Sequence, residues 1–65
     1  MSLLSDCRNI LNSLTSYFKK KGYTNEDIIG GFDEASEFIT KVKLPNGTKE
    51  IVFKAIEDKK KEIGK

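Results

Sequence analysis

The stretch KVKLPNGTKEIVF, residues 41–53, constrains the fold of this chain more than any other segment. Two short runs of alternating apolar and polar residues flank residues 45–47, and Asn-Gly between such runs is a strong signal for a two-residue hairpin. An even loop pairs Val42 with Ile51. The segment therefore predicts a β-hairpin with one apolar face, made by Phe38, Val42, Leu44, Ile51, Phe53 and Ala55.

The first third of the chain has the 3–4 residue spacing of an amphipathic helix. Its apolar positions are Leu3, Leu4, Cys7, Ile10, Leu11, Leu14 and Phe18. Ser2 or Ser5 is a suitable N-cap, and Gly22 stands where a left-handed residue ends a helix. A Schellman ending would pack Tyr23 against Phe18. We predict a helix over residues 3–21.

Residues 24–39, TNEDIIGGFDEASEFI, fit two interpretations. As a helix, Thr24 and Asp27 form a near capping box, but two adjacent glycines cost roughly 1 kcal/mol each relative to alanine. As a strand over residues 27–32, followed by a turn at residues 34–36, the segment pairs Phe32 with Phe38 on the core face of the hairpin. We favour the strand.

The predicted fold class is therefore α+β, with the order α-β-β-β-α. An N-terminal helix precedes a three-stranded antiparallel meander, and a short C-terminal helix follows in the charged segment after residue 55. The alternative is α-α-β-β-α, with residues 24–39 helical. In both arrangements residues 1–65 form a single small domain.

The residue composition limits the chemistry. The 65 residues include one cysteine and no histidine, so we expect no disulfide within the chain and no cysteine–histidine metal site. The chain lacks a signal-peptide pattern and an apolar run of about 18 residues, which favours a cytoplasmic protein without a membrane segment. We predict no cofactor and no bound metal.

Three features of the sequence resemble functional sites but have simpler structural interpretations. Cys7 lies on the apolar stripe of the first helix without a base nearby, so we interpret it as a core residue. The acidic residues at 33, 34 and 37 lack the ligand spacing of an EF-hand loop. The glycine pair at residues 30–31 belongs to no phosphate-binding motif. We therefore predict no catalytic residue and no enzyme activity.

Nucleic-acid binding is the alternative function. The net charge of +2 conceals a segregation into +3 over residues 1–23, −5 over residues 24–37 and +4 over residues 38–65. A winged helix is disfavoured because its recognition helix, FDEASEFI, would be acidic. The order of elements is similar to that of double-stranded-RNA-binding domains, where lysines at the last helix contact phosphates. The corresponding lysines here are Lys54, Lys59, Lys60 and Lys61, with residues 19–21 as a further basic group.

The function we favour from the sequence is protein binding through the outer face of the predicted sheet. That face would expose β-branched apolar residues among lysines, and a domain with so small a core gains stability by covering them. We hypothesise a non-enzymatic homo-oligomer, adaptor or inhibitor. Its predicted partner-binding residues are Ile29, Ile39, Lys41, Lys43, Val52 and Lys54.

Overall fold

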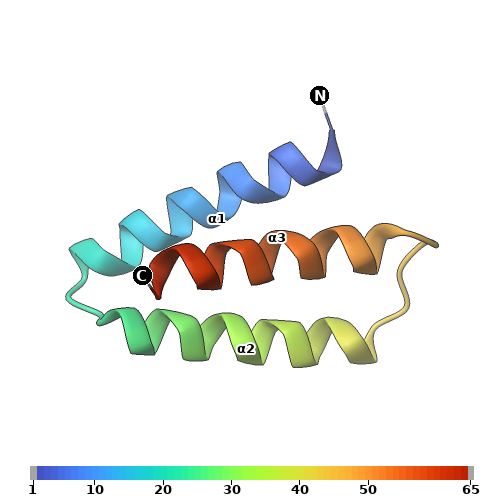
Figure 1. The fold of residues 1–65 in the computed structure, drawn as a ribbon. Helices are drawn as coiled ribbons and strands as arrows, with labels where there is room; N and C mark the ends of the chain where they lie inside the picture. The colour runs from blue at the N-terminus through green and yellow to red at the C-terminus, as the bar shows by residue number, and fades with distance from the viewer. Residues whose placement is uncertain (1, 65) are drawn as a thin grey trace.

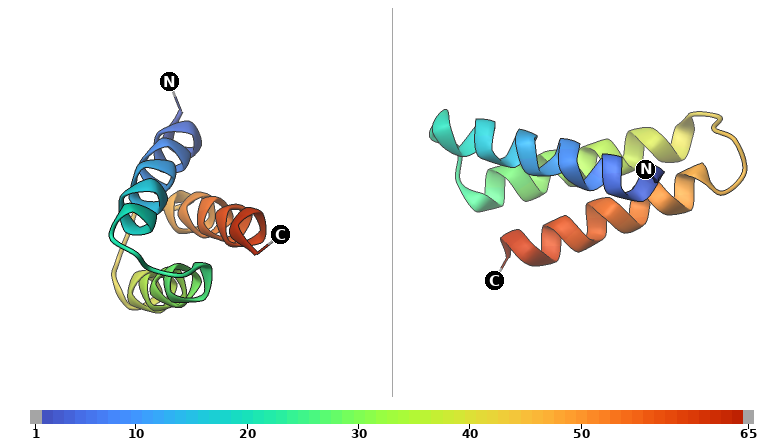
Figure 2. Two further views of the ribbon diagram at one scale, coloured as in Figure 1. Left: turned by 90° about the vertical axis from the view of Figure 1, so that its left-hand side faces the viewer. Right: turned by 90° about the horizontal axis from the view of Figure 1, so that it is seen from above.

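The chain folds into three α-helices. A computed structural model describes residues 2–64 and contains α1 (Leu3–Lys20), α2 (Asn25–Lys41) and α3 (Thr48–Ile63), as Figure 1 shows. Both α1 and α2 pack mainly on α3 and contact each other little. Seen along the bundle, α3 lies to one side of the α1–α2 pair (Figure 2, left). The fold is thus an open three-helix bundle, and residues 2–64 contain no strand.

The predicted first helix is confirmed, together with both of its ends. The Ser2 hydroxyl accepts a hydrogen bond of 3.1 Å from the backbone N–H of Ser5. At the other end Gly22 has a φ of 96°. The N–H of Tyr23 donates to the carbonyl of Phe18 over 3.1 Å, and the two rings meet edge to face at 5.8 Å. This Schellman ending turns the chain sharply from α1 into α2.

The strand predicted over residues 27–32 is wrong, and the helical interpretation of residues 24–39 is the correct one. Thr24 and Asp27 form a complete capping box, in which each side chain accepts a hydrogen bond from the other residue's backbone N–H. Ile28 and Phe32 follow on one face and are buried. The cap and this apolar face together outweigh the helix propensity that the two glycines lose.

The predicted hairpin over residues 41–53 is also wrong, so both the α-β-β-β-α fold and its α-α-β-β-α alternative fail. The Asn-Gly pair makes a turn, but Gly47, with a φ of 85°, is the N-cap of α3 rather than part of a hairpin loop. The N–H of Thr48 donates to the carbonyl of Pro45 over 3.1 Å. The C-terminal helix therefore begins at residue 48, well before the predicted start.

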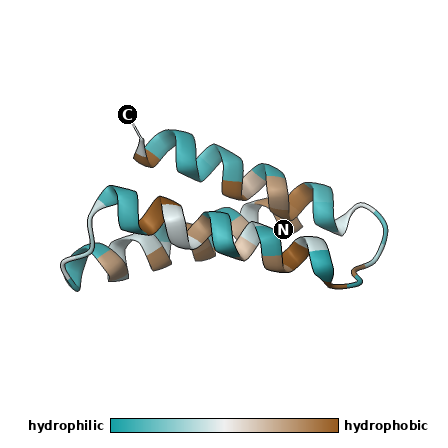
Figure 3. Cartoon of the chain, turned by 90° about the horizontal axis from the view of Figure 1, so that it is seen from below, coloured by the Kyte–Doolittle hydropathy of each residue, from teal (hydrophilic) through white to brown (hydrophobic). Residues whose placement is uncertain are grey.

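The core lies where the three helices meet. Ile28 and Phe32 of α2 cluster with Ile56 and Ile63 of α3. Around them pack the half-buried residues Leu11, Phe18, Ile29, Ile39 and Val52. Figure 3 shows the corresponding pattern along each helix, in which apolar stretches alternate with polar ones. Each helix therefore contributes an apolar face to one shared core.

The bundle exposes more surface than its mass predicts. Its accessible surface is 4914 Å² for a mass of 7.3 kDa. The usual scaling for monomeric proteins gives about 4,200 Å² at this mass. The radius of gyration is 11.9 Å, against about 10.7 Å for a compact domain of this length. Large apolar side chains account for part of the excess, among them Leu3, Ile10, Leu14, Tyr17, Tyr23, Phe38 and Leu44.

Candidate protein-binding face

A second apolar stripe runs along α1, on the side that does not face α3. We call Leu3, Ile10, Leu14 and Tyr17 the outer stripe. Their side chains are 43%, 60%, 38% and 54% exposed. Leu3, Ile10 and Tyr17 recur every seven residues, which is the repeat of a coiled-coil seam. The core cluster does not account for this regularity, because within residues 2–64 it is built with other positions of α1.

The core contacts of α1 come from the inner stripe, which we define as Leu4, Leu11, Thr15 and Phe18. Leu11 and Phe18 pack against the core cluster, and Thr15 is the most buried residue of the helix. The Thr15 hydroxyl donates to the carbonyl of Leu11 over 2.8 Å, so its polar atom is satisfied. The apolar arc of α1 is therefore wider than the arc that its neighbours cover.

An apolar groove of about 330 Å³ lies between α1 and α2, next to the outer stripe. Its lining residues are Leu14, Phe18, Tyr23, Asp27, Ile28, Gly31, Phe32 and Ala35. Leu14 also borders a second hollow with Ile10 and Tyr17, so the groove and the outer stripe form one continuous surface. We call this surface the α1–α2 face.

The side of α2 that borders the α1–α2 face is open. A Cβ atom at Gly31 would meet nothing within 4 Å, so the chain itself does not require glycine there. Phe38 follows Gly31 by seven residues, which places it two turns later on the same side of α2. Its side chain is 67% exposed. A small residue beside a large exposed ring leaves room for another helix against α2.

The charges around the α1–α2 face are unevenly distributed. Asp27 lines the groove, and Glu34 follows it two turns later along α2. The opposite sign gathers at the end of α1, where Lys20 and Lys21 are exposed. The Lys21 ammonium lies 5.4 Å from the centre of the Tyr17 ring, a cation–π contact. A partner of this face therefore meets acid on α2 and base at the end of α1.

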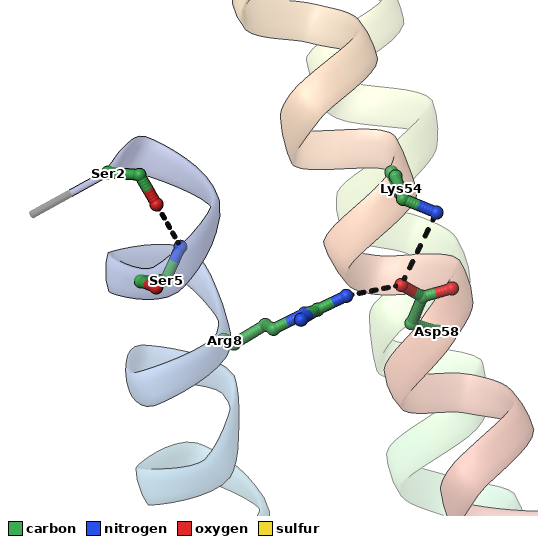
Figure 4. Close-up of polar contacts among 5 residues, drawn as sticks. All are labelled: Ser2, Ser5, Arg8, Lys54 and Asp58. Atoms are coloured by element: carbon green, nitrogen blue, oxygen red, sulfur yellow. Dashed lines mark hydrogen bonds and ion pairs between the residues drawn. The ribbon is translucent and has the colours of Figure 1, made fainter.

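The lysines of α3 are mostly engaged with acids of the same chain. Figure 4 shows Asp58 accepting from Arg8 at 3.0 Å, with Lys54 at 3.8 Å. The hydrogen bond from Arg8 lowers the pKa of Asp58 below its usual value. Lys60 contacts Asp33 and Glu57, and the hydrogen bond to Asp33 raises the pKa of Lys60.

The lysines that were predicted from the sequence to bind nucleic acid are therefore not equally free to contact a phosphate. Lys59 donates to Asn12 and lies 3.4 Å from Glu62. Lys54 and Lys60 are paired as described above, whereas Lys61 is exposed. A phosphate would have to displace the acids that hold Lys54, Lys59 and Lys60. The predicted nucleic-acid site is thus partly neutralised by the fold.

The six predicted partner-binding residues do not share a face, because the sheet that would have aligned them is absent from residues 2–64. Ile29, Ile39 and Val52 are half-buried against the core cluster. The other three are exposed at separate places: Lys41 ends α2, Lys43 lies in the following loop, and Lys54 lies on α3.

Cys7 is half-buried on α1, between the inner and outer stripes. Within residues 2–64 no three acidic or cysteine side chains are grouped so as to hold a metal ion. No helix in the same range is long and apolar enough to cross a membrane.

Sequence reasoning placed Ile10 and Leu14 on one apolar stripe with the core positions of α1 and left Tyr17 out, and so missed these three residues as a surface. The sequence does contain a signal for them. Apolar residues at 3, 10 and 17 stand directly before apolar residues at 4, 11 and 18. Two adjacent seven-residue repeats of apolar residues place two apolar stripes side by side on α1, and a single neighbouring helix covers only one of them.

The chain matches no protein-family model, and its comparison with curated proteins and with solved structures finds no match.

Proposed function

We propose that this chain is a protein-binding module that receives an amphipathic helix on its α1–α2 face. The observation that carries the proposal is the outer stripe: a second, regularly spaced apolar seam that remains exposed beside an apolar groove. Laying the apolar side of a helix into such a groove is a recurrent mode of protein recognition. The sheet face predicted from the sequence is replaced by this helical surface.

The shape of the bundle supports the proposal. Three helices leave one side of the α1–α2 pair uncovered, and a fourth helix there would complete a four-helix bundle. Such a helix would contact Ile10 and Tyr17 on α1 and Gly31 and Phe38 on α2. An exposed apolar patch of this kind commonly marks an interaction site in a protein of this size.

Site-specific photocrosslinking in cells tests the proposal. A benzoylphenylalanine replaces Tyr17, an aromatic residue that is already 54% exposed, so the fold should tolerate the change. We expect covalent adducts with protein, identified by mass spectrometry. The control carries the same group at Glu37, which is exposed on α2 but outside the groove lining. Equal labelling at the two positions, or no protein adduct at Tyr17, contradicts the proposal.

A further inference from the structure

We infer that the helix received by the α1–α2 face is α1 of a second copy of this chain, in a two-fold dimer whose two α1 helices run parallel. This inference rests on the proposed function and names its partner. Three observations favour the second copy over other helices: the spacing of the outer stripe, the charges at the two ends of the groove, and the area that the monomer leaves exposed.

The spacing fits a helix pairing with itself. Together with the half-buried Cys7 at its border, the outer stripe has intervals of four, three, four and three residues. This alternation keeps one seam in register between two helices over several turns. In a parallel pair each residue of the seam meets its own counterpart, so Ile10 packs on Ile10 and Leu14 on Leu14 of the second copy.

The position of α2 decides the direction. Because α2 borders the outer stripe across the groove, it lies to one side of any helix pair formed through that stripe. In an antiparallel pair the two-fold axis is perpendicular to the helices, and both copies of α2 would fall on the same side and compete for one space. In a parallel pair the axis runs along the helices, and the two α2 helices lie on opposite sides.

The charges agree with the parallel arrangement. An incoming α1 then runs antiparallel to α2, as α1 does in its own chain. Its basic end, with Lys20, arrives at the start of α2, where Asp27 lies in the groove. Its acidic residue Asp6, in the first turn, arrives near Lys41 in the last turn of α2. Both ends of the groove therefore meet charges of opposite sign.

The monomer leaves much apolar surface exposed for its size. The accessible surface of 4914 Å² exceeds the value expected for a compact monomer by about 700 Å². A standard stable interface buries about 800 Å² on each partner. The surplus is of that order for the whole chain, and the outer stripe contributes four of its seven large exposed apolar side chains.

Solution mass tests the dimer. Sedimentation equilibrium over a concentration series should show a monomer–dimer equilibrium for the parent chain. Ile10→Lys with Tyr17→Lys should be monomeric while its helical circular dichroism is retained, because both side chains are exposed in the monomer. A parent that stays monomeric at every concentration overturns the inference. If Tyr17 then still crosslinks to another protein, the proposed function stands without it.

A pair of charge variants tests the orientation with a matched control. Lys20→Glu should raise the dimer Kd about tenfold, since it sets an acid beside Asp27 in both of the symmetry-related contacts. Lys19→Glu makes the same charge change one residue earlier, away from the seam, and should leave the Kd within about twofold. Equal effects of the two variants contradict the arrangement.

The single cysteine reports the direction independently. In the parallel pair Cys7 faces Cys7 of the second copy, so mild oxidation should join the two chains by one disulfide. In Cys7→Ser with Ser16→Cys the thiol lies on the exposed side of α1, and this variant should crosslink far more slowly. Faster crosslinking through position 16 than through Cys7 overturns the parallel arrangement.

Discussion

The two apolar stripes of α1 lie on one helix and have similar composition, yet they differ in what covers them. The inner stripe is covered by the core of the bundle, and the outer stripe faces solvent beside the α1–α2 groove. The difference shows that an apolar pattern predicts that a helix face will be buried but does not identify the element that buries it. Packing among the three helices covers the inner stripe, and the outer stripe is the surface that we propose for association.

The arrangement of the three helices leaves one stripe of α1 uncovered. In a bundle of three helices, α1 has α3 as its principal neighbour and only slight contact with α2. A fourth helix would be needed to cover the remaining arc of α1. Residues 2–64 supply three helices, and all three take part in the shared core or its cover.

The largest expected effect separates two neighbouring aromatic residues of α1. Phe18 packs on the core and on Tyr23, so Phe18→Ala should reduce the free energy of unfolding by about 2–4 kcal/mol. Tyr17→Ala should change it by less than about 0.5 kcal/mol in the monomer. Urea denaturation at a protein concentration low enough for the monomer measures both. If both substitutions reduced the free energy of unfolding equally, the inner and outer stripes would not differ in their contribution to the core.

The next effect concerns the turn that places α2 beside the outer stripe. Gly22 has a φ of 96°, a left-handed conformation that a side chain disfavours. Gly22→Ala should therefore destabilise the fold by about 1–2 kcal/mol, although a Cβ atom there meets nothing within 4 Å. Thermal unfolding compares it with Gly30→Ala, where the added methyl also meets nothing within 4 Å and the backbone φ is not in the left-handed region. A neutral Gly22→Ala would mean that the turn does not depend on this conformation.

Substitutions in the glycine pair of α2 should change stability less, and they separate a position that lines the groove from one that does not. Both Gly30→Ala and Gly31→Ala should stabilise the monomer by about 0.5–1 kcal/mol, because neither new methyl meets another atom within 4 Å. Only Gly31 lines the groove. Gly31→Ala should therefore weaken association while Gly30→Ala does not, as sedimentation equilibrium would show. If both glycines behave alike in association, the groove is not part of the interface.

The smallest effect is a pH dependence from the surface ion pairs. The hydrogen bond from Arg8 lowers the pKa of Asp58, so the stability from this pair is present above the ordinary aspartate pKa of about 3.9 and is lost as the pH falls through the lower value in the folded protein. Contact with Asp33 raises the pKa of Lys60, so its contribution is present below about pH 10.4 and is lost at higher pH.

Urea unfolding at two pH values measures the acid limb. At pH 7 Asp58→Asn should have a slightly lower midpoint than the parent, because the pair with Arg8 is largely solvated. At pH 2 the two midpoints should converge, and Arg8→Gln should behave like Asp58→Asn. A difference that persists unchanged at pH 2 would show that the carboxylate charge is not its cause.

Sequence reasoning succeeded where the deciding contacts are local. The limits of α1, its Ser2 cap and its ending at Gly22 and Tyr23 all depend on residues within one or two turns of each other. The same reasoning identified Thr24 and Asp27 as a near capping box but gave more weight to the glycine pair. The candidate face was missed because exposure of Ile10 or Tyr17 depends on where α2 and α3 lie.

The sequence by itself determined the first helix with its two ends, and it contained the capping box of the second helix without settling that this segment is helical. Tertiary structure decided the second half of the chain. The apolar run of residues 51–53 is too short to distinguish a strand from a helix, and Asn-Gly suits either a hairpin or the start of a helix. A helix that begins at Thr48 packs Ile56 and Ile63 against the apolar face of α2. The burial of these side chains stabilises the helix over the hairpin.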